Sequence, residues 1–350
     1  MIPREVVLQV LSLEAMLIVL TLLIVFGHAV WYRYYSARRD VLLEQGRDAL
    51  VAVLASGDVD RLPGVLVTMP RRELIRLLTD IAPSIGGPHR DMIVQLAARL
   101  GLTEAATRWL RSPFWWRRLQ GARLLTLVGR DAGTLAGLAT DRHALVRAQW
   151  AEALGWHRFP GGAEALIPLL ADESGHVRYT ARESLMLLGP AAKPAIVHAL
   201  ERESPPDLLV LLEVAAAIAS VDALAVGLRH SRSDNPQVRV RAARLLRAIG
   251  AADAAARLVE LLEDPSAMVR AAAATAIGSI AHWPGALALS RRLDDPDWEV
   301  RTMSSVALQR LGAPGELLLR RARDAGTGPG AEVARQVLEA AARLRDPVTA

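Results

Sequence analysis

The sequence predicts an all-α protein: an α-solenoid of helix pairs preceded by one transmembrane helix near the N-terminus. Three observations carry this prediction. A phrase recurs every 29 to 31 residues, its apolar positions follow helical spacing, and no charged residue interrupts Ala15–Trp31. A fixed period of this size is typical of a solenoid. Because a solenoid grows along one axis, 350 residues need not divide into several globular domains.

The composition narrows the class further. Apolar residues make up 52% of the chain, and no β-branched segment alternates as a strand would. The absence of cysteine excludes disulfides, thiolate zinc sites and cysteine nucleophiles. The net charge of +5 comes from arginine, with Lys193 as the only lysine, and charges alternate in sign along most helices. This pattern is typical of solvated faces rather than of a nucleic-acid surface.

We predict that residues 1–35 form a membrane anchor, with the span at about 10–32. About 20 apolar residues are needed to cross the hydrocarbon core, and this apolar run is long enough. The run ends in aromatic residues of the kind that lie at a membrane interface: Trp31, Tyr32, Tyr34 and Tyr35. A cleaved signal peptide is the alternative. We favour an uncleaved single-pass anchor, because the run is long and no small-residue cleavage site follows it.

Flanking arginines predict the orientation of this anchor. Arg4 precedes the apolar run, whereas Arg33, Arg38, Arg39 and Arg47 follow it. The positive-inside rule then places the C-terminal bulk in the cytoplasm.

Three polar residues in the anchor, Glu14, Thr21 and His28, are seven apart and therefore share one helix face. One interpretation is a stripe that contacts a partner helix in the bilayer. The other, which we favour, is that Glu14 and His28 lie at opposite interfaces and only Thr21 is deep.

Residues 36–86 predict a juxtamembrane helical cap that lacks the repeat. Asp40–Leu54 is amphipathic, and Pro70–Ile81 begins at a proline, as helices often do. Arg71 and Arg72 could contact anionic lipid headgroups. We favour a solvated first turn for them.

The predicted solenoid covers residues 87–325, and residues 326–350 predict a C-terminal capping helix. In each repeat, a valine followed by arginine anchors the second helix of a pair. Apolar or small residues follow at positions 4, 5, 7, 8 and 11, and glycine is common at position 12, where it suits a left-handed cap. The anchors are Val146, Val177, Val238, Val269 and Val300, with weaker copies at Arg117 and Leu208.

The unit LLxDxxxxVRxxAAxALGxxG resembles a HEAT repeat of the short bacterial, PBS-lyase HEAT-like type, over about residues 87–323. The resemblance implies a ladder in which aspartates and arginines of successive repeats are hydrogen-bonded. The matching residues are Asp141 and Arg147, Asp172 and Arg178, Asp264 and Arg270, and Asp295 and Arg301. Asp234 lies one residue closer to Arg239, Ser112 and Glu203 replace aspartate, and Leu209 replaces arginine. We expect a weaker ladder in those copies.

The resemblance also implies that positions 2, 3, 6, 9 and 10 of the second helices line a concave partner-binding face. Two copies stand out there. Arg241, Arg244 and Arg247 form a basic strip, and the 208 copy places apolar residues at positions expected to be exposed: Val210, Leu211, Val214 and Ile218. An exposed apolar patch marks an interaction site. The alternative is a local shift that buries this helix more deeply.

Tryptophans concentrate in the early repeats, where Trp115, Trp116 and Trp156 fall at turns or helix ends. Such residues are frequent hot spots at interfaces. The bland alternative, which we favour slightly, is that they fill the solenoid groove.

The sequence gives little support for catalysis. No histidine pair has metal-ligand spacing with a carboxylate on one face, and no phosphate-binding loop or nucleophile motif occurs. We therefore expect no enzyme activity, cofactor, metal or small-molecule substrate. The predicted function is a scaffold at the bacterial inner membrane that binds a protein partner, for which an integral membrane enzyme is one candidate. The alternatives are a lyase-type HEAT-like enzyme and a nucleic-acid-binding solenoid.

Overall fold

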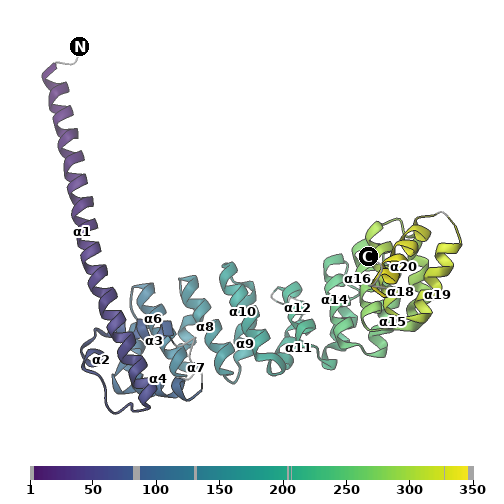
Figure 1. Ribbon diagram of the computed structural model, residues 1–350, viewed down its shortest axis with the longest axis horizontal. Helices are drawn as coiled ribbons and strands as arrows, with labels where there is room; N and C mark the ends of the chain where they lie inside the picture. Colours follow the sequence, from purple (N-terminus) through teal and green to yellow (C-terminus); the bar gives the residue numbers. More distant parts are fainter. Residues whose placement is uncertain are drawn as a thin grey trace. The chain divides into compact units, whose positions relative to one another are not determined.

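The computed structural model describes residues 4–81, 87–129, 132–202, 205, 207–326 and 328–345. Throughout those ranges every regular element is a helix (Figure 1). The chain forms two compact units, Met1–Leu135 and Ala136–Ala350. The division lies inside residues 87–325, which we predicted as one solenoid. The domain boundaries stay a prediction.

In its described residues, unit 1 contains one long helix and six shorter ones. They are α1 (Arg4–Ser56), α2 (Gly64–Thr68), α3 (Arg71–Ile81), α4 (Pro88–Arg99), α5 (Leu102–Trp109), α6 (Trp115–Val128) and α7 (Ala132–Leu135). α3 begins directly after Pro70 and packs on α1, α5 and α6. Its buried residues, Leu74, Ile75, Leu77 and Leu78, follow the helical spacing of one apolar face.

On α1, all described side chains from Glu14 to His28 are exposed. Segment Met16–Ser56 is long and apolar enough to cross a membrane, with a mean hydropathy of 1.8 in its most apolar window and none of that window buried. The large side chains of Met16 and Phe26 are 60% and 69% exposed. A signal sequence passes the same test of length and composition, so membrane anchoring stays a proposal.

Unit 2 is a row of helix pairs. The second helices are α8 (Ala144–His157), α10 (Gly175–Leu188), α12 (Leu208–Ile218), α14 (Pro236–Ile249), α16 (Ala267–Ser279) and α18 (Trp298–Arg310). The first helices are α9 (Gly162–Leu166), α11 (Lys193–Glu201), α13 (Leu224–His230), α15 (Ala252–Glu260), α17 (Ala286–Arg291) and α19 (Ala313–Asp324). α20 (Pro329–Arg345) comes last. Short 3-10 turns adjoin the first helices: η2 (Ala136–Thr140), η3 (Ile167–Ala171), η4 (Gly189–Ala192), η5 (Val221–Ala223), η6 (Leu261–Glu263), η7 (Trp283–Gly285) and η8 (Arg292–Asp294).

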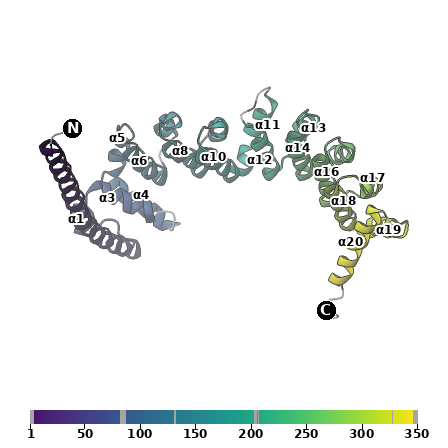
Figure 2. The ribbon, with the colours of Figure 1, turned by 90° about the horizontal axis from the view of Figure 1, so that it is seen from above.

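The second helices of unit 2 form one layer, because each packs on the second helix of the next pair. The first helices form the other layer, and from α12 to α20 the second helices follow the inner edge of the curve (Figure 2). Apolar side chains at the repeat positions fill the space between the layers: Val238, Leu246, Val269, Ile277 and Leu308 are all buried. The core is therefore a strip that continues from repeat to repeat, as expected for a solenoid.

Position 12 of each repeat has a positive φ whether or not it is glycine. Gly250 has a φ of 67° and Gly312 of 72°. Where glycine is missing, Arg158, Ala219 and Ala281 still adopt φ values of 47°, 41° and 52°. The helix ending is thus imposed by the packing of the repeats, although a side chain makes this conformation costly.

This regularity corrects the register of the weakest copy. Counting back twelve residues from Ala219 places the anchor at Asp207, one residue before Leu208. Positions 4 and 7 are then Leu211 and Val214, and both are fully buried. Our expectation that they are exposed is wrong, because α12 turns them toward the core between α10, α11 and α14. Val210 and Ile218 are partly exposed.

Candidate partner-binding groove

Arginine side chains tie three second helices of unit 2, α8, α14 and α16, to the following repeat, whereas Arg178 and Arg301 donate to the backbone of their own loops. Arg270 donates through Nε and Nη2 to the two carboxylate oxygens of Asp295, at 2.9 and 2.7 Å. Arg147 contacts Asp172 in the same bidentate way, at 2.7 and 2.8 Å. Arg239 repeats the arrangement with Asp264 at 2.8 Å for both bonds. A bidentate pair of this kind fixes both distance and orientation.

The same arginines also hold their own loop. Nη1 of Arg270 donates to the backbone oxygen of Asp264, six residues earlier, at 2.9 Å. In the Arg239 copy the corresponding acceptor is the backbone oxygen of Ser233, at 2.8 Å, so Ser233 rather than Asp234 occupies the aspartate position. Each arginine therefore joins its own loop to that of the next repeat and sets the spacing of the second helices.

Burial and charge define how the ladder aspartates behave. The side chain of Asp295 is 0% exposed and that of Asp172 only 9% exposed. The hydrogen bonds from the Arg147 guanidinium hold the pKa of Asp172 below its ordinary value, against the opposing effect of burial. These charged groups are paired with one another, which makes them structural.

The ladder is interrupted at α12. In the corrected register Leu208 takes the arginine position and has no donor, and Glu203 lies outside the described residues. A different ion-pair network bridges this copy. Glu213 of α12 accepts from Arg182 of α10 at 3.3 Å and from Arg241 of α14 at 2.9 Å. Arg241 therefore helps to connect three second helices.

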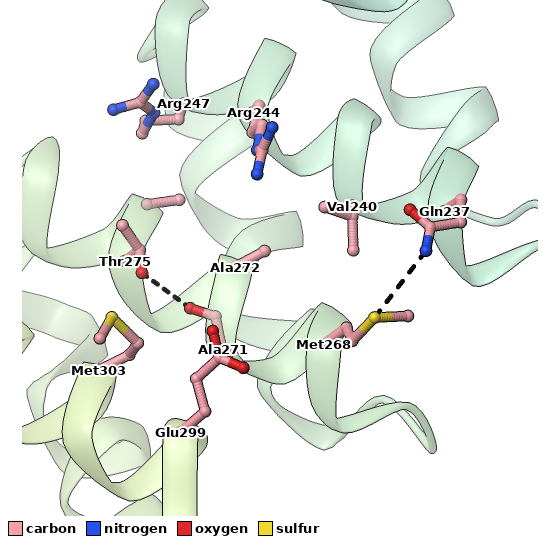
Figure 3. Close-up of a pocket in the computed structure, with 11 residues that line it drawn as sticks. Gln237, Val240, Arg244, Arg247, Met268, Ala271, Ala272, Thr275, Glu299 and Met303 are labelled. Carbon is pink, nitrogen blue, oxygen red and sulfur yellow. Dashed lines mark hydrogen bonds between the residues drawn. The ribbon is translucent and has the colours of Figure 1, made fainter. Parts of the chain in front are cut away.

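A groove of about 370 Å³ crosses the second-helix face where α14, α16 and α18 lie side by side (Figure 3). Arg244 and Arg247 form its α14 side, and Glu299 and Met303 form its α18 side. The floor between them is made by small residues of α16. The floor residues are Ala271, Ala272, Thr275 and Ala276.

Small residues open this groove. Gly278 of α16 lies so close to α18 that an added Cβ would be 2.6 Å from the Cα of Ala307. With α16 and α18 in close contact, side chains at positions 2, 3 and 6 of α16 are short and leave a trough between the longer side chains of α14 and α18. The hydroxyl of Thr275 donates to its own helix, to the oxygen of Ala271 at 2.9 Å.

The charges in the groove are not used by the fold. Arg244, Arg247 and Glu299 are exposed and make no ion pair within the described residues. Two cations on one side and one anion on the other leave a polar trough with apolar stretches at Val240, Met268 and Met303. The predicted strip is thus divided: Arg244 and Arg247 face the groove, and Arg241 belongs to the network around Glu213.

The predicted tryptophans do not assemble into one site. Trp115 and Trp116 lie on α6 in unit 1, with ring centroids 6.1 Å apart, and Trp116 is 40% exposed. Trp156 lies at the end of α8 in unit 2 and is 55% exposed. Each is accessible, and none of them lines the groove.

The polar residues of the anchor lie on α1, and all three side chains are exposed. The Thr21 hydroxyl donates to the oxygen of Leu17 at 2.7 Å, so its donor is satisfied within the helix. The ring of His28 stacks on Tyr32 with centroids 6.4 Å apart. Whether this stripe contacts a partner helix stays a prediction.

Three groove residues were absent from the sequence prediction: Gln237, Met268 and Glu299. Each stands one residue before a repeat anchor, in the first turn of a second helix. Position −1 shares a helix face with positions 2 and 3, because residues three and four apart are neighbours on a helix. Extending the predicted face back by one turn would have found them.

A two-layered row of helix pairs, joined by arginine–aspartate rungs, defines an α-solenoid with an open groove. A family model described as HEAT repeats matches residues 132–219 and 221–309, which together make up about half of the chain. The chain belongs to the HEAT-repeat family. HEAT-repeat solenoids are typical scaffolds for protein interaction.

The chain is similar to several solved structures at low sequence identity, and a TM-score above 0.5 is found for the first of the following three. A chain of the Kap95:Nup1 complex is 14% identical with a TM-score of 0.52, and the match covers 79% of this chain and 43% of that one. An engineered protein is 22% identical with a TM-score of 0.41, covering 87% and 94% of the two chains. The CpcE–CpcF phycocyanin lyase of Nostoc sp. PCC7120 is 20% identical with a TM-score of 0.30, covering 68% and 94%. No curated protein matches the chain.

Proposed function

We propose that this protein is a membrane-anchored scaffold whose groove between α14 and α18 holds a segment of a partner protein. The observation that carries the proposal is the set of unpaired charges on an otherwise small-residue face. A charged side chain that has no partner within the fold does not stabilise it. Arg244, Arg247 and Glu299 are therefore available to recognise a ligand of complementary charge.

The shape of the groove favours a polypeptide segment. A chain lying across α16 could place a carboxylate against Arg244 and Arg247 and a basic group near Glu299. Its apolar side chains would then contact Met268 and Met303. Opposite charges on the two sides give such a segment a preferred direction, and charge complementarity contributes mainly specificity and association rate.

The membrane part of the proposal rests on α1 and its flanks. The described apolar side chains from Met16 to Phe26 are exposed to solvent, at a cost of about 25 cal/mol for each Å² of apolar surface left in water. The arginines that follow the apolar run favour a cytoplasmic solenoid at a bacterial inner membrane. The anchor would then hold the bound partner at the bilayer, and an integral membrane protein is the partner that fits this arrangement.

We propose a binding function rather than an enzymatic one. Within the described ranges no group of three histidine, aspartate or glutamate residues is placed to hold a metal ion. The groove presents no nucleophile paired with a base. A nucleic-acid surface is disfavoured by Glu299, which would repel a phosphate backbone, and by the pairing of Arg241 with Glu213.

Site-specific photocrosslinking tests the groove. A photoreactive amino acid is placed at Thr275 in the full chain expressed in its own host, and the matched control carries it at Leu287, which is exposed on the first-helix layer. We expect one discrete crosslinked protein from Thr275 and none from Leu287. The crosslink should be lost in an Arg244→Glu/Arg247→Glu double variant and retained in Arg291→Glu on the outer layer.

Two results would contradict the proposal. Equal crosslinking from Thr275 and Leu287 would show a nonspecific surface. A crosslink that survives both charge reversals and a Thr275→Trp change that fills the groove would place the partner elsewhere. The same capture repeated from detergent without residues 1–35 tests the anchor, because unchanged recovery would mean that α1 does not contact the partner.

A further inference from the structure

Unit 1 holds a second cavity, at the point where the apolar part of α1 gives way to arginines. Its volume is about 450 Å³, within the range of small-ligand pockets, which run from about 300 to 1,000 Å³. α1 contributes Trp31, Tyr32, Arg38, Arg39 and Leu42, and the start of α3 contributes Pro70, Arg72 and Glu73. The two helices pack on each other.

The charges around the cavity favour an anion. Three arginines and one carboxylate, that of Glu73, line the cavity, and Oε2 of Glu73 is buried without a hydrogen-bond partner among the described residues. Nε of Arg39 is buried without a hydrogen-bond partner among the described residues, and the nearest carboxylate oxygen, on Asp40, is 3.9 Å away. Arg72 is exposed and makes no ion pair in the described part of the chain. Arginine presents several fixed donors and suits a phosphate group.

The position of the cavity along α1 selects the source of that phosphate. Phe26 is 69% exposed, and Trp31 follows five residues later. At about 1.5 Å of rise per residue this is roughly 8 Å, the depth at which headgroups lie next to the hydrocarbon core. Trp31 and Tyr32 are 55% and 60% exposed, as residues of an interfacial aromatic belt are.

We propose that this cavity binds the phosphate headgroup of an anionic phospholipid, with Arg38, Arg39 and Arg72 as its ligands. The inference rests on the proposed membrane anchoring of α1. It favours for Arg72 the lipid contact over the solvated first turn that we preferred from the sequence, since the packing of α3 on α1 brings Arg72 into one cavity with Arg38 and Arg39. A lipid held there would connect α1 to α3 and set the orientation of unit 1 at the bilayer surface.

Lipid photocrosslinking in nanodiscs tests the site in the full chain. The discs are mostly phosphatidylcholine with a minor share of phosphatidylglycerol, and one of the two lipids carries a photoreactive headgroup. We expect the phosphatidylglycerol probe to label residues around the cavity in preference to the phosphatidylcholine probe. Loss of one arginine should lower this preference about fivefold, since each basic residue near an anionic surface contributes about that factor.

Matched variants separate the cavity from net charge. Arg38→Gln/Arg39→Gln/Arg72→Gln should abolish the preference, whereas Arg47→Gln/Arg61→Gln/Arg71→Gln removes the same charge in unit 1 outside the cavity and should retain it. Glu73→Gln should raise the preference, and a damaged fold would not produce that gain.

Several outcomes would overturn the inference. One is equal loss in the two triple variants, and another is no effect of the cavity variants. Competition by glycerol phosphate in detergent as effective as that by phosphatidylglycerol would mean that the site takes a soluble phosphate instead. A chain that inserts into nanodiscs without lipid preference contradicts the lipid site alone. A chain that does not insert at all contradicts the membrane anchor.

Discussion

Replacing Asp295 by alanine removes the acceptor from the most buried rung of the ladder. The wild-type carboxylate accepts two hydrogen bonds from Arg270 and one from the backbone nitrogen of Asp297, at 3.0 Å. Asp297 is the N-cap residue of α18. The substitution therefore leaves the Arg270 guanidinium without its partner and removes a contact at the start of the next second helix.

The burial of both partners sets the magnitude. The Arg270 side chain is 11% exposed and that of Asp295 is 0% exposed. Removing one member of a buried pair costs about 3–5 kcal/mol, because the remaining charge loses its compensation. Urea lowers the free energy of unfolding by about 1–3 kcal/mol for each molar, so the unfolding midpoint should fall by at least about 1 M.

The assay is urea unfolding of the full chain in detergent, followed by circular dichroism. Glu260→Ala is the control, because Glu260 pairs with Arg257 at 2.5 Å while its own side chain is 61% exposed. A surface pair contributes about 0–1 kcal/mol, so this midpoint should move by a few tenths of a molar at most. The double variant Arg270→Met/Asp295→Leu should recover most of the loss, since apolar residues remove both charges together.

Equal midpoints for Asp295→Ala and Glu260→Ala would refute the reasoning, because burial would then have no bearing on the value of the rung. A double variant no more stable than Asp295→Ala would also refute it, since the loss would not come from an uncompensated charge.

Three further predictions concern the repeats. Ala281→Gly should raise the free energy of unfolding by about 0.5–1 kcal/mol, because the strain that a side chain causes at positive φ exceeds the entropic cost of glycine. Ala248→Gly inside α14 is the control and should lower the free energy of unfolding by a similar amount. The urea midpoints of the two variants measure both changes. Arg147 lowers the pKa of Asp172, so Asp172 should contribute stability that is complete above its unfolded pKa of about 3.9. This stability should be lost as the pH falls through the lower, folded pKa. The thermal unfolding temperature of Asp172→Asn should therefore depend less on pH in that acid range than that of the wild type. Gly278→Ala should cost about 1–3 kcal/mol in the same urea assay, because the new Cβ meets the backbone of Ala307, and an unchanged midpoint would show that α16 and α18 can separate freely.

Much of the fold could be predicted from the sequence because the same pattern of apolar residues occurs in several repeats. The spacing of Val238, Val269 and Val300 gives the period, and the apolar positions after each anchor give the buried face. The register of the 208 copy was predicted wrongly by one residue, because its run of apolar residues fits several registers almost equally well. The positive φ of Ala219 and the burial of Leu211 and Val214 show that its anchor is Asp207.

The candidate site was predicted less completely. Arg244 and Arg247 were expected on an open face, and they line the groove. The α18 side of the groove was not predicted. Glu299 lies two repeats after Arg244 in the sequence, and only the packing of α16 between α14 and α18 brings the two side chains to the same groove. Likewise, Arg72 and Arg39 come together only because α3 packs on α1.

The sequence by itself determined the helical period, the apolar face of each helix and the uncharged run at the N-terminus. These follow from local spacing, since residues three and four apart share a helix face. The tertiary structure decided which charges are paired and which are left unpaired. Asp295 and Glu299 are both acidic residues within five positions of Val300, yet the first is buried against Arg270 and the second faces an open groove. The physical reason is that pairing depends on the distance between neighbouring repeats, which side-chain packing sets and no single repeat contains.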